Sequence, residues 1–312
     1  MLKQKTKQGN APYKESTKTN RAVYKKTYVL YLLMPALFIY IFFFILPSIT
    51  GLLLSFFNVR TFRISAITFA GLTNYVNVLT DRYLNIAIRN TLIFALVTTI
   101  GKVGFGLALA VFVNKKFHGS RYIRTVFFLP AVLNNVAVGL VFRAMMHPSE
   151  GLINKFLKLI GMDLLTQNWL TNPAIAIFSC AFVEIWKWSG FTMVILLAGL
   201  QAIDDTYYEA AELDGASGFQ KFFHITFPLM MPAFTNALIV NMVGGLKVFD
   251  IIQSLTKGGP GSATAVFGTL IYSSFSSGRY GEGCAASIIL CICVLVIVLP
   301  TYKFFTNKEV EM

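Results

Sequence analysis

Residues 28–57 read YVLYLLMPALFIYIFFFILPSITGLLLSFF, a run of 30 residues without Asp, Glu, Lys or Arg. A helix rises about 1.5 Å per residue, so this run exceeds the roughly 20 residues that cross 30 Å of hydrocarbon. A secretory signal peptide has an apolar core of only about 7–15 residues and is followed by a small-residue cleavage site. No such site follows here. We therefore expect residues 28–57 to form an uncleaved first membrane span.

Five further apolar runs follow this one, near residues 86–113, 122–146, 174–200, 224–250 and 283–305. Hydrocarbon offers no partner to backbone N–H and C=O groups, so helix is the expected conformation of a single span. The runs do not alternate between polar and apolar residues as the strands of a membrane barrel would. The sequence predicts an all-α integral membrane protein with six transmembrane helices.

The composition agrees with a membrane protein. The 312 residues are 55% hydrophobic and only 13% charged, whereas a soluble protein has about 25% charged residues. This excludes a cytosolic enzyme, a disordered chain or a soluble nucleic-acid-binding protein as the main interpretation. The net charge of +13 fits basic loops on the cytoplasmic side of a membrane better than a nucleic-acid partner.

The distribution of Lys and Arg predicts the orientation. Residues 1–27 alone contain eight of these residues, and with the N-terminus inside, fifteen lie in cytoplasmic segments against seven in outer segments. Cytoplasmic segments of membrane proteins carry this excess. We therefore expect a basic cytoplasmic tail over 1–27, a six-helix domain over 28–305 and a second cytoplasmic tail over 306–312.

Neither metal nor nucleotide chemistry is indicated. The four cysteines lie in or beside the apolar runs without a C-x-x-C pair, so they are expected to act as small apolar side chains. The three histidines are scattered, and the phosphate-binding pattern G-x-x-x-x-G-K-[ST] does not occur. We expect no metal site and no cofactor in this chain.

The loop between the fourth and fifth runs is unusual because it is acidic. Residues 201–222 contain five Asp and Glu against Lys221 alone. Thr206 and Glu209 have the spacing of a capping box, and Gly215 can end a helix in the left-handed conformation. A helix of two to three turns is expected here. An amphipathic connector on the bilayer is the alternative, but an anionic inner leaflet attracts basic segments, so a docking helix for a cytoplasmic protein is favoured.

The same loop resembles a known family. It contains Glu209-Ala210-Ala211, three residues, Gly215, nine residues, Ile225, one residue and Phe227-Pro228. This spacing is similar to the EAA loop of permease subunits of binding-protein-dependent ABC importers, with Phe227 where the pattern has Leu. Three other stretches resemble the carbohydrate-importing branch, namely Asn90-Thr91, 124–130 and 255–260. The likeness as a whole covers about residues 28–305. The resemblance assigns ATPase coupling, within a coupling loop at about 201–228, to Glu209, Ala210, Ala211, Gly215, Ile225 and Pro228.

The resemblance also implies partners and a location. Such a permease pairs with a second permease and with two ATP-binding cassette subunits, which bind ATP and Mg. An extracytoplasmic binding protein delivers the sugar. The chain is then a multi-pass protein of the bacterial cell (inner) membrane, a transporter subunit rather than an enzyme, surrounded by lipid and without a nucleic-acid partner.

Charged residues inside spans are costly and often functional. Glu184, Trp186, Lys187 and Trp188 lie near the middle of the fourth run. Glu184 and Lys187 are three residues apart and are expected to pair on one helix face, beside aromatic surface that suits the apolar faces of a sugar. The alternative is a self-neutralised pair with tryptophans as packing anchors. The resemblance favours the substrate pathway, because permeases of this branch contact sugar from the corresponding helix.

The fifth run adds weaker candidates for the substrate pathway. Asn241, Lys247 and Asp250 lie within it, although Lys247 and Asp250 are again three apart and an exposed ion pair near the outer end is an alternative. Lys102 is expected within reach of a span end, from which its ammonium can snorkel to water.

Two other functions stay open as alternatives. Lys187 and Lys247 could each hold an anion, which leaves a permease for glycerol phosphate or an acidic sugar possible. An integral membrane enzyme would need clustered catalytic groups, which the sequence lacks. A secondary transporter would need inverted repeats with broken helices, and none is apparent.

Overall fold

The computed structural model describes residues 31–60, 67–115 and 118–309. The predicted basic tail over 1–27 lies outside them. The chain divides into two units, 1–53 and 54–312. A helix over Tyr31–Leu54 is long and apolar enough to cross a membrane, and it supplies all of the described part of the first unit. It contains the π-helical turn η1 (Ile41–Ile45) and α2 (Leu46–Leu54).

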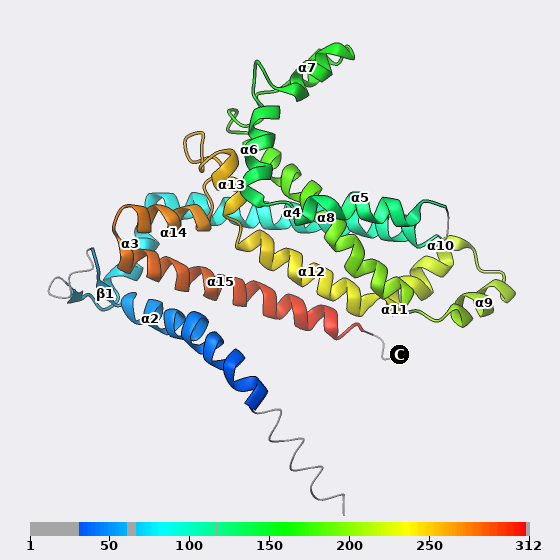
Figure 1. The fold of residues 1–312 in the computed structure, drawn as a ribbon, viewed down its shortest axis with the longest axis horizontal. Helices are drawn as coiled ribbons and strands as arrows, with labels where there is room; N and C mark the ends of the chain where they lie inside the picture. The colour runs from blue at the N-terminus through cyan, green and yellow to red at the C-terminus, as the bar shows by residue number, and fades with distance from the viewer. Residues whose placement is uncertain (1–30, 61–66, 116–117, 310–312) are drawn as a thin grey trace, which may run out of the picture. The chain divides into compact units, whose positions relative to one another are not determined.

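The second unit contains three more continuous helices of spanning length: α4 (Arg82–Asn114), α8 (Ala176–Gln201) and α15 (Tyr280–Thr306) (Figure 1). Two helix pairs pass the same test only when joined across a bend. They are α5 (Ser120–Val132) with α6 (Asn135–Met145), bent by 97°, and Gly218–Leu229 with α12 (Met231–Leu246), bent by 69°. The described residues therefore contain four continuous candidate spans, and up to six if each bent pair is one span.

Local sequence explains the first bend. Pro130 lies in the last turn of α5, and Leu133 and Asn134 are extended. Asn134 then caps α6, because its Oδ1 accepts a hydrogen bond from the N–H of Val136 at 2.8 Å. The run at 122–146 therefore contains two helices rather than the single helix that was predicted.

The fifth run also ends earlier than predicted. Helix α12 stops at Leu246, and Phe249, with φ −145° and ψ −60°, interrupts the helical path before α13 (Asp250–Leu255) begins. Lys247 and Asp250 consequently do not share one helix face.

Close helix packing holds the second unit together. Figure 1 shows α4 running alongside α8. Gly101 and Gly106 lie at this contact: a Cβ on Gly106 would meet Cγ2 of Thr192 at 2.9 Å, and one on Gly101 would overlap Ile185. Small residues let membrane helices approach closely, so these two glycines permit the contact between α4 and α8.

Short elements complete the second unit. A two-residue ladder is the exception to the all-α prediction within the described ranges, with Phe57 opposite Phe69. The remaining elements are β1 (Phe57–Asn58), β2 (Thr68–Phe69), α3 (Thr73–Thr80), α7 (Leu152–Leu159), η3 (Asp163–Leu165), α9 (Asp205–Leu213), α10 (Gly218–Lys221), η4 (Phe222–Thr226), α11 (Phe227–Leu229) and α14 (Phe267–Ser276).

Candidate functional site

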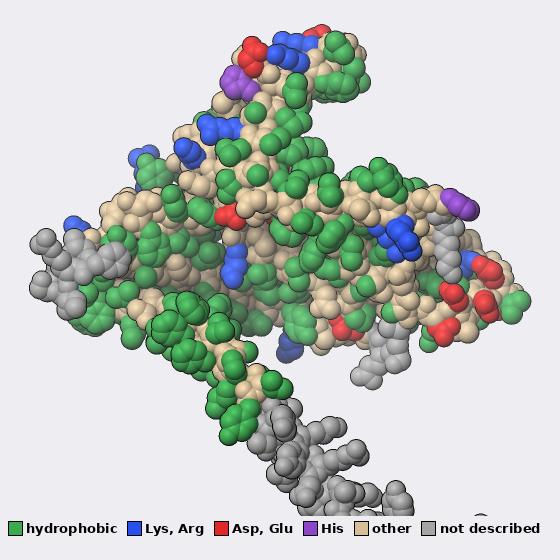
Figure 2. Space-filling view, in the orientation of Figure 1, with side chains coloured by type: hydrophobic (Ala, Val, Ile, Leu, Met, Phe, Trp, Pro, Cys, Tyr) green, Lys and Arg blue, Asp and Glu red, His purple; other side chains and the backbone are tan. Residues whose placement is uncertain are grey.

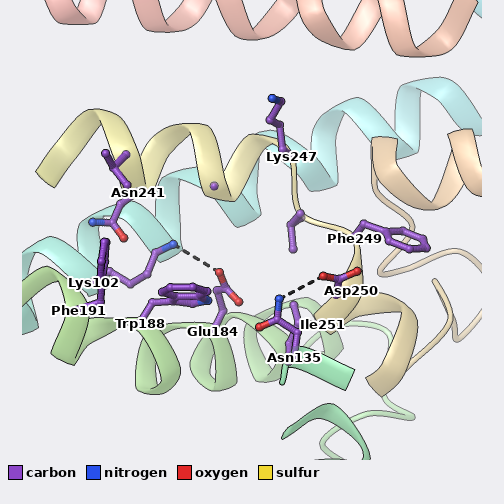
Figure 3. Close-up of a pocket in the computed structure, with 13 residues that line it drawn as sticks. Lys102, Asn135, Glu184, Trp188, Phe191, Asn241, Lys247, Phe249, Asp250 and Ile251 are labelled. Atoms are coloured by element: carbon purple, nitrogen blue, oxygen red, sulfur yellow. Dashed lines mark hydrogen bonds and ion pairs between the residues drawn. The ribbon is translucent and has the colours of Figure 1, made fainter. Parts of the chain in front are cut away.

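A cavity of about 290 Å³ lies among α4, α6, α8, α12 and α13 (Figure 3). Four charged groups, two amides and three aromatic rings contribute to its wall. Five of the seven predicted pathway residues line it, and Trp186 and Lys187 do not. The lining residues are Lys102, Asn135, Glu184, Trp188, Phe191, Val240, Asn241, Gly244, Lys247, Val248, Phe249, Asp250 and Ile251.

A buried interhelical ion pair dominates this cavity. Lys102 Nζ on α4 lies 3.5 Å from Glu184 Oε1 on α8, and the two side chains are only 2% and 9% exposed. The predicted pairing of Glu184 with Lys187 is therefore wrong. Lys102 is the 21st of 33 residues in α4, so the expectation that it snorkels from a span end is also wrong. A partner on the neighbouring helix thus neutralises the buried Glu184.

Lys187 has a different environment. Its Nζ donates a hydrogen bond to the carbonyl of Ala131 at 3.2 Å and lies 4.3 Å from the ring centroid of Trp188. Ala131 lies in the last turn of α5, where backbone carbonyls lack helical partners and favour a nearby cation. Lys187 thus anchors the bent α5 to α8 instead of facing the cavity.

The amides of the cavity are held by neighbouring helices. Asn241 Nδ2 donates to Thr192 Oγ1 at 3.0 Å and to the carbonyl of Ala237 at 2.8 Å. Asn135 Nδ2 donates to Asp250 Oδ2 at 3.2 Å. No ion pair joins Lys247 to Asp250 within the described ranges, and Figure 3 shows Lys247 pointing away from Asp250. The alternative of a Lys247–Asp250 ion pair is thus not formed, because the chain leaves the helix between the two residues.

Trp186 faces another part of the protein. Its ring centroid lies 5.1 Å from that of Phe142 on α6, and the residue is 40% exposed. Packing, the alternative considered for the tryptophans, describes it better than a pathway role. Sequence reasoning did not select Lys102 or Phe191 as site residues. For Lys102 a signal existed, since it lies in the middle of the 86–113 run.

The cavity can hold a polyhydroxylated molecule. Glu184 and Asp250 accept hydrogen bonds, Lys102 donates them, and amides do both. The rings of Trp188, Phe191 and Phe249 offer apolar surface. Glu184 and Trp188 are the ninth and thirteenth residues of the 26-residue α8, which places them roughly 12–18 Å along the helix.

The acidic loop forms the predicted short helix, α9. Its N-cap is Asp204, whose Oδ1 accepts a hydrogen bond from the N–H of Thr206 at 2.9 Å. The helix cap therefore lies two residues before Thr206, the residue predicted to be the cap. The hydrogen bond from Thr206 lowers the pKa of the Asp204 carboxyl. Gly215 ends the helix with φ +75°, as predicted, and the N–H of Ala216 bonds to the carbonyl of Ala211 at 2.9 Å.

The predicted coupling residues occupy different parts of this loop. Glu209 and Ala210 are exposed, Ala211 is buried, and Ile225 and Pro228 are half-buried where the chain re-enters the helical body. Figure 2 shows the acidic side chains gathered at the end of the molecule that carries α9. An apolar group lies beside them, in which the rings of Phe219 and Phe223 are 4.5 Å apart.

Two contacts fasten α9 to the segment that follows it. Lys221 Nζ lies 2.7 Å from Glu212 Oε1, and the hydroxyls of Tyr208 and Thr226 are 3.0 Å apart. The ion pair lowers the pKa of the Glu212 carboxyl. The loop is therefore a braced unit rather than a flexible connector.

Asn90 and Thr91, one of the other stretches with family resemblance, contact the chain just after another of them, 255–260. Asn90 Nδ2 donates to the carbonyls of Ser262, Ala263 and Ala265 at 2.9–3.3 Å. Thr91 Oγ1 accepts from the N–H of Phe267 at 3.0 Å. These two residues of α4 thus hold the loop between α13 and α14 in place.

Known proteins share both the sequence and the architecture. Residues 102–307 match the family described as binding-protein-dependent transport system inner membrane component. The chain is 36% identical to a probable ABC transporter permease, YurN, of Bacillus subtilis, covering 89% of this chain and 96% of that protein. It is 35% identical to the trehalose/maltose transport permease MalF of Thermococcus litoralis, over 91% and 96%.

A solved structure agrees with these relatives. A bacterial ABC transporter involved in the import of the acidic polysaccharide alginate matches with a TM-score of 0.78 and 26% identity, covering 93% of this chain and 99% of that one. The family match covers more than half of the chain and includes the braced acidic loop and the whole cavity lining. The chain therefore belongs to the binding-protein-dependent transport system inner membrane components, as a permease subunit of an ABC importer and not an enzyme.

Proposed function

We propose that this permease forms part of the translocation pathway for a sugar or oligosaccharide, and that the cavity around Glu184 is where the sugar contacts this chain. The observation that carries the proposal is the composition of the cavity wall, in which charged and amide groups lie beside Trp188 and Phe191. The trehalose and maltose transport named for one relative supports this substrate class.

The energy for transport comes from partner subunits in this proposal. The exposed Glu209, Ala210 and Leu213 of α9 dock on one of two ATP-binding cassette subunits, which bind ATP and Mg. The bracing by Lys221 and Tyr208 supports such a role, because a stiff element transmits displacement that a flexible loop would absorb. A second permease completes the pathway, and an extracytoplasmic binding protein delivers the sugar.

The orientation follows from the same proposal. With α9 in the cytoplasm, six spans place both termini there as well, and the excess of Lys and Arg supports that topology. The residues over 1–27 and 306–312 are then cytoplasmic tails, and the protein is a multi-pass component of the bacterial inner membrane.

An acidic sugar is the alternative substrate, and the import of acidic alginate by the solved relative favours it. Lys102 does not support it, because the ammonium is already paired with Glu184. Lys247 is the remaining cation of the lining. The two carboxylates and two ammonium groups of the cavity balance, so a neutral sugar is the first choice.

Uptake by the complete transporter in proteoliposomes tests the proposal. Thermal shift of the cognate binding protein against a panel of neutral and acidic sugars first identifies the ligand. Trp188→Leu is then expected to reduce uptake of that sugar more than Trp186→Leu, which alters an aromatic residue of the same helix outside the cavity. Equal uptake by the two variants, with normal assembly, would remove the cavity from the pathway.

A further inference from the structure

The segment between α6 and α8 carries an amphipathic helix with its apolar face turned away from the protein. In α7, Leu152, Phe156 and Leu159 fall on one face and are 64%, 61% and 85% exposed. Lys155 lies beside that face and is paired with Glu150, whose Oε2 is 2.6 Å from its Nζ; Lys158 lies further round the helix. Apolar side chains flanked by lysines are typical of a helix that lies in the interface of a bilayer.

A second cavity, of about 690 Å³, opens beside this helix. Its wall is almost entirely apolar and includes Ile153 of α7, Trp169, and Phe178 and Phe182 of α8. The frame is fixed by Asn154, which is only 4% exposed: its Nδ2 donates to the carbonyl of Gln167, and its Oδ1 accepts from the indole N–H of Trp169 at 2.8 Å. The cavity is thus a built feature and not a gap beside a loose loop.

The position of the cavity along α8 places it at the edge of the hydrocarbon. Phe178 and Phe182 are the third and seventh residues of α8, within about 9 Å of its first residue. They are 49% and 56% exposed, so the cavity is continuous with the surface that a membrane span presents to lipid. Tryptophans such as Trp169 concentrate at this level of a bilayer.

We propose that this cavity holds one acyl chain of a phospholipid. The largely apolar wall disfavours a sugar, because Gln167 and Ser179 alone among the lining residues could replace hydrogen bonds that the sugar makes with water. The volume lies within the range of sites that enclose small ligands, about 300–1,000 Å³. The orientation given under the proposed function puts this lipid in the outer leaflet, whereas the site itself does not depend on that orientation.

Photolabelling of the complete transporter in proteoliposomes tests the site. The probe is a phosphatidylglycerol with a diazirine in one acyl chain, and the adducts are mapped by mass spectrometry. We expect labelling of residues 169–182 to exceed, several-fold, that of Phe105, a half-exposed aromatic on α4. Labelling no stronger than at Phe105 would overturn the proposal, because it would mean ordinary annular lipid.

A filling variant and a matched control sharpen the experiment. Ser179 lines the cavity and bonds to the carbonyl of Ile175, so Ser179→Phe should abolish the excess labelling. Ser287→Phe changes a serine of α15 with the same type of bond, to Gly283, and should leave it intact. If a photo-crosslinker replacing Phe182 captures the second permease instead of lipid, the face is a subunit interface and the proposal fails.

Discussion

The buried pair of Lys102 and Glu184 gives the sharpest energetic prediction. Removing one partner leaves an uncompensated charge where both side chains are less than a tenth exposed. Such a loss costs about 3–5 kcal/mol, whereas replacing both partners by apolar groups of similar size is often near neutral. Lys102→Met and Glu184→Leu should therefore each destabilise the subunit strongly, and the double variant should be closer to the wild type than either single variant.

Thermal or denaturant unfolding of the assembled transporter measures this interaction as a double-mutant cycle. Independent losses add within about 0.5 kcal/mol, so coupling of several kcal/mol distinguishes a pair from two separate polar residues. Lys187→Met is the matched control, because Lys187 bonds to a carbonyl of α5 and its loss should add to that of Glu184. Additive effects of Lys102→Met and Glu184→Leu would refute the pairing.

Three other predictions follow from backbone geometry and packing. Gly215 has φ +75° with nothing within 4 Å of an added Cβ, so Gly215→Ala should destabilise the folded loop by about 1–2 kcal/mol through backbone conformation alone. It should also reduce transport-coupled ATP hydrolysis relative to the control Gly218→Ala, and equal ATPase activities of the two variants would contradict this. Gly106→Ala should weaken the α4–α8 contact and lower the melting temperature, whereas Gly104→Ala should not, because a Cβ at position 104 meets open space. Equal melting temperatures of the two variants would exclude the packing role of Gly106. Asn90→Ala removes three hydrogen bonds to one loop and should increase the rate of proteolysis near residues 256–266 relative to the wild type. An unchanged rate would show that the loop keeps its conformation without Asn90.

The spans could be predicted because hydrophobic length is a local property of the chain. The direction of the 97° bend between α5 and α6 could not be predicted, although Pro130 lies close to the position of the bend. The hydrophobic pattern also failed to locate the end of the fifth helix. Gly244 and Gly245 lie inside α12 without ending it, and the break comes later, at Phe249. Such bends depend on which neighbour receives the freed backbone groups, and that neighbour is distant in the sequence.

The error over Glu184 has the same origin. Residues three apart on a helix can pair, but that rule describes solvated surfaces, where no other partner competes. Inside the protein, Glu184 and Lys187 each found a group on a different helix, Lys102 on α4 and the carbonyl of Ala131 on α5. When a charged residue lies in the middle of an apolar run, its partner should therefore be sought among charged residues in the middle of other runs.

The cavity and the acidic loop are physically continuous. Helix α8 carries Glu184 and ends three residues before Asp204, the cap of α9. Tyr208 of α9 contacts Thr226, just before α11 and α12. Asn241 then joins α12 back to α8 through Thr192. A displacement of α9 in the proposed mechanism would consequently reach the cavity wall along two helices at once, and because Asn241 ties them together, they would move as one body rather than slide apart.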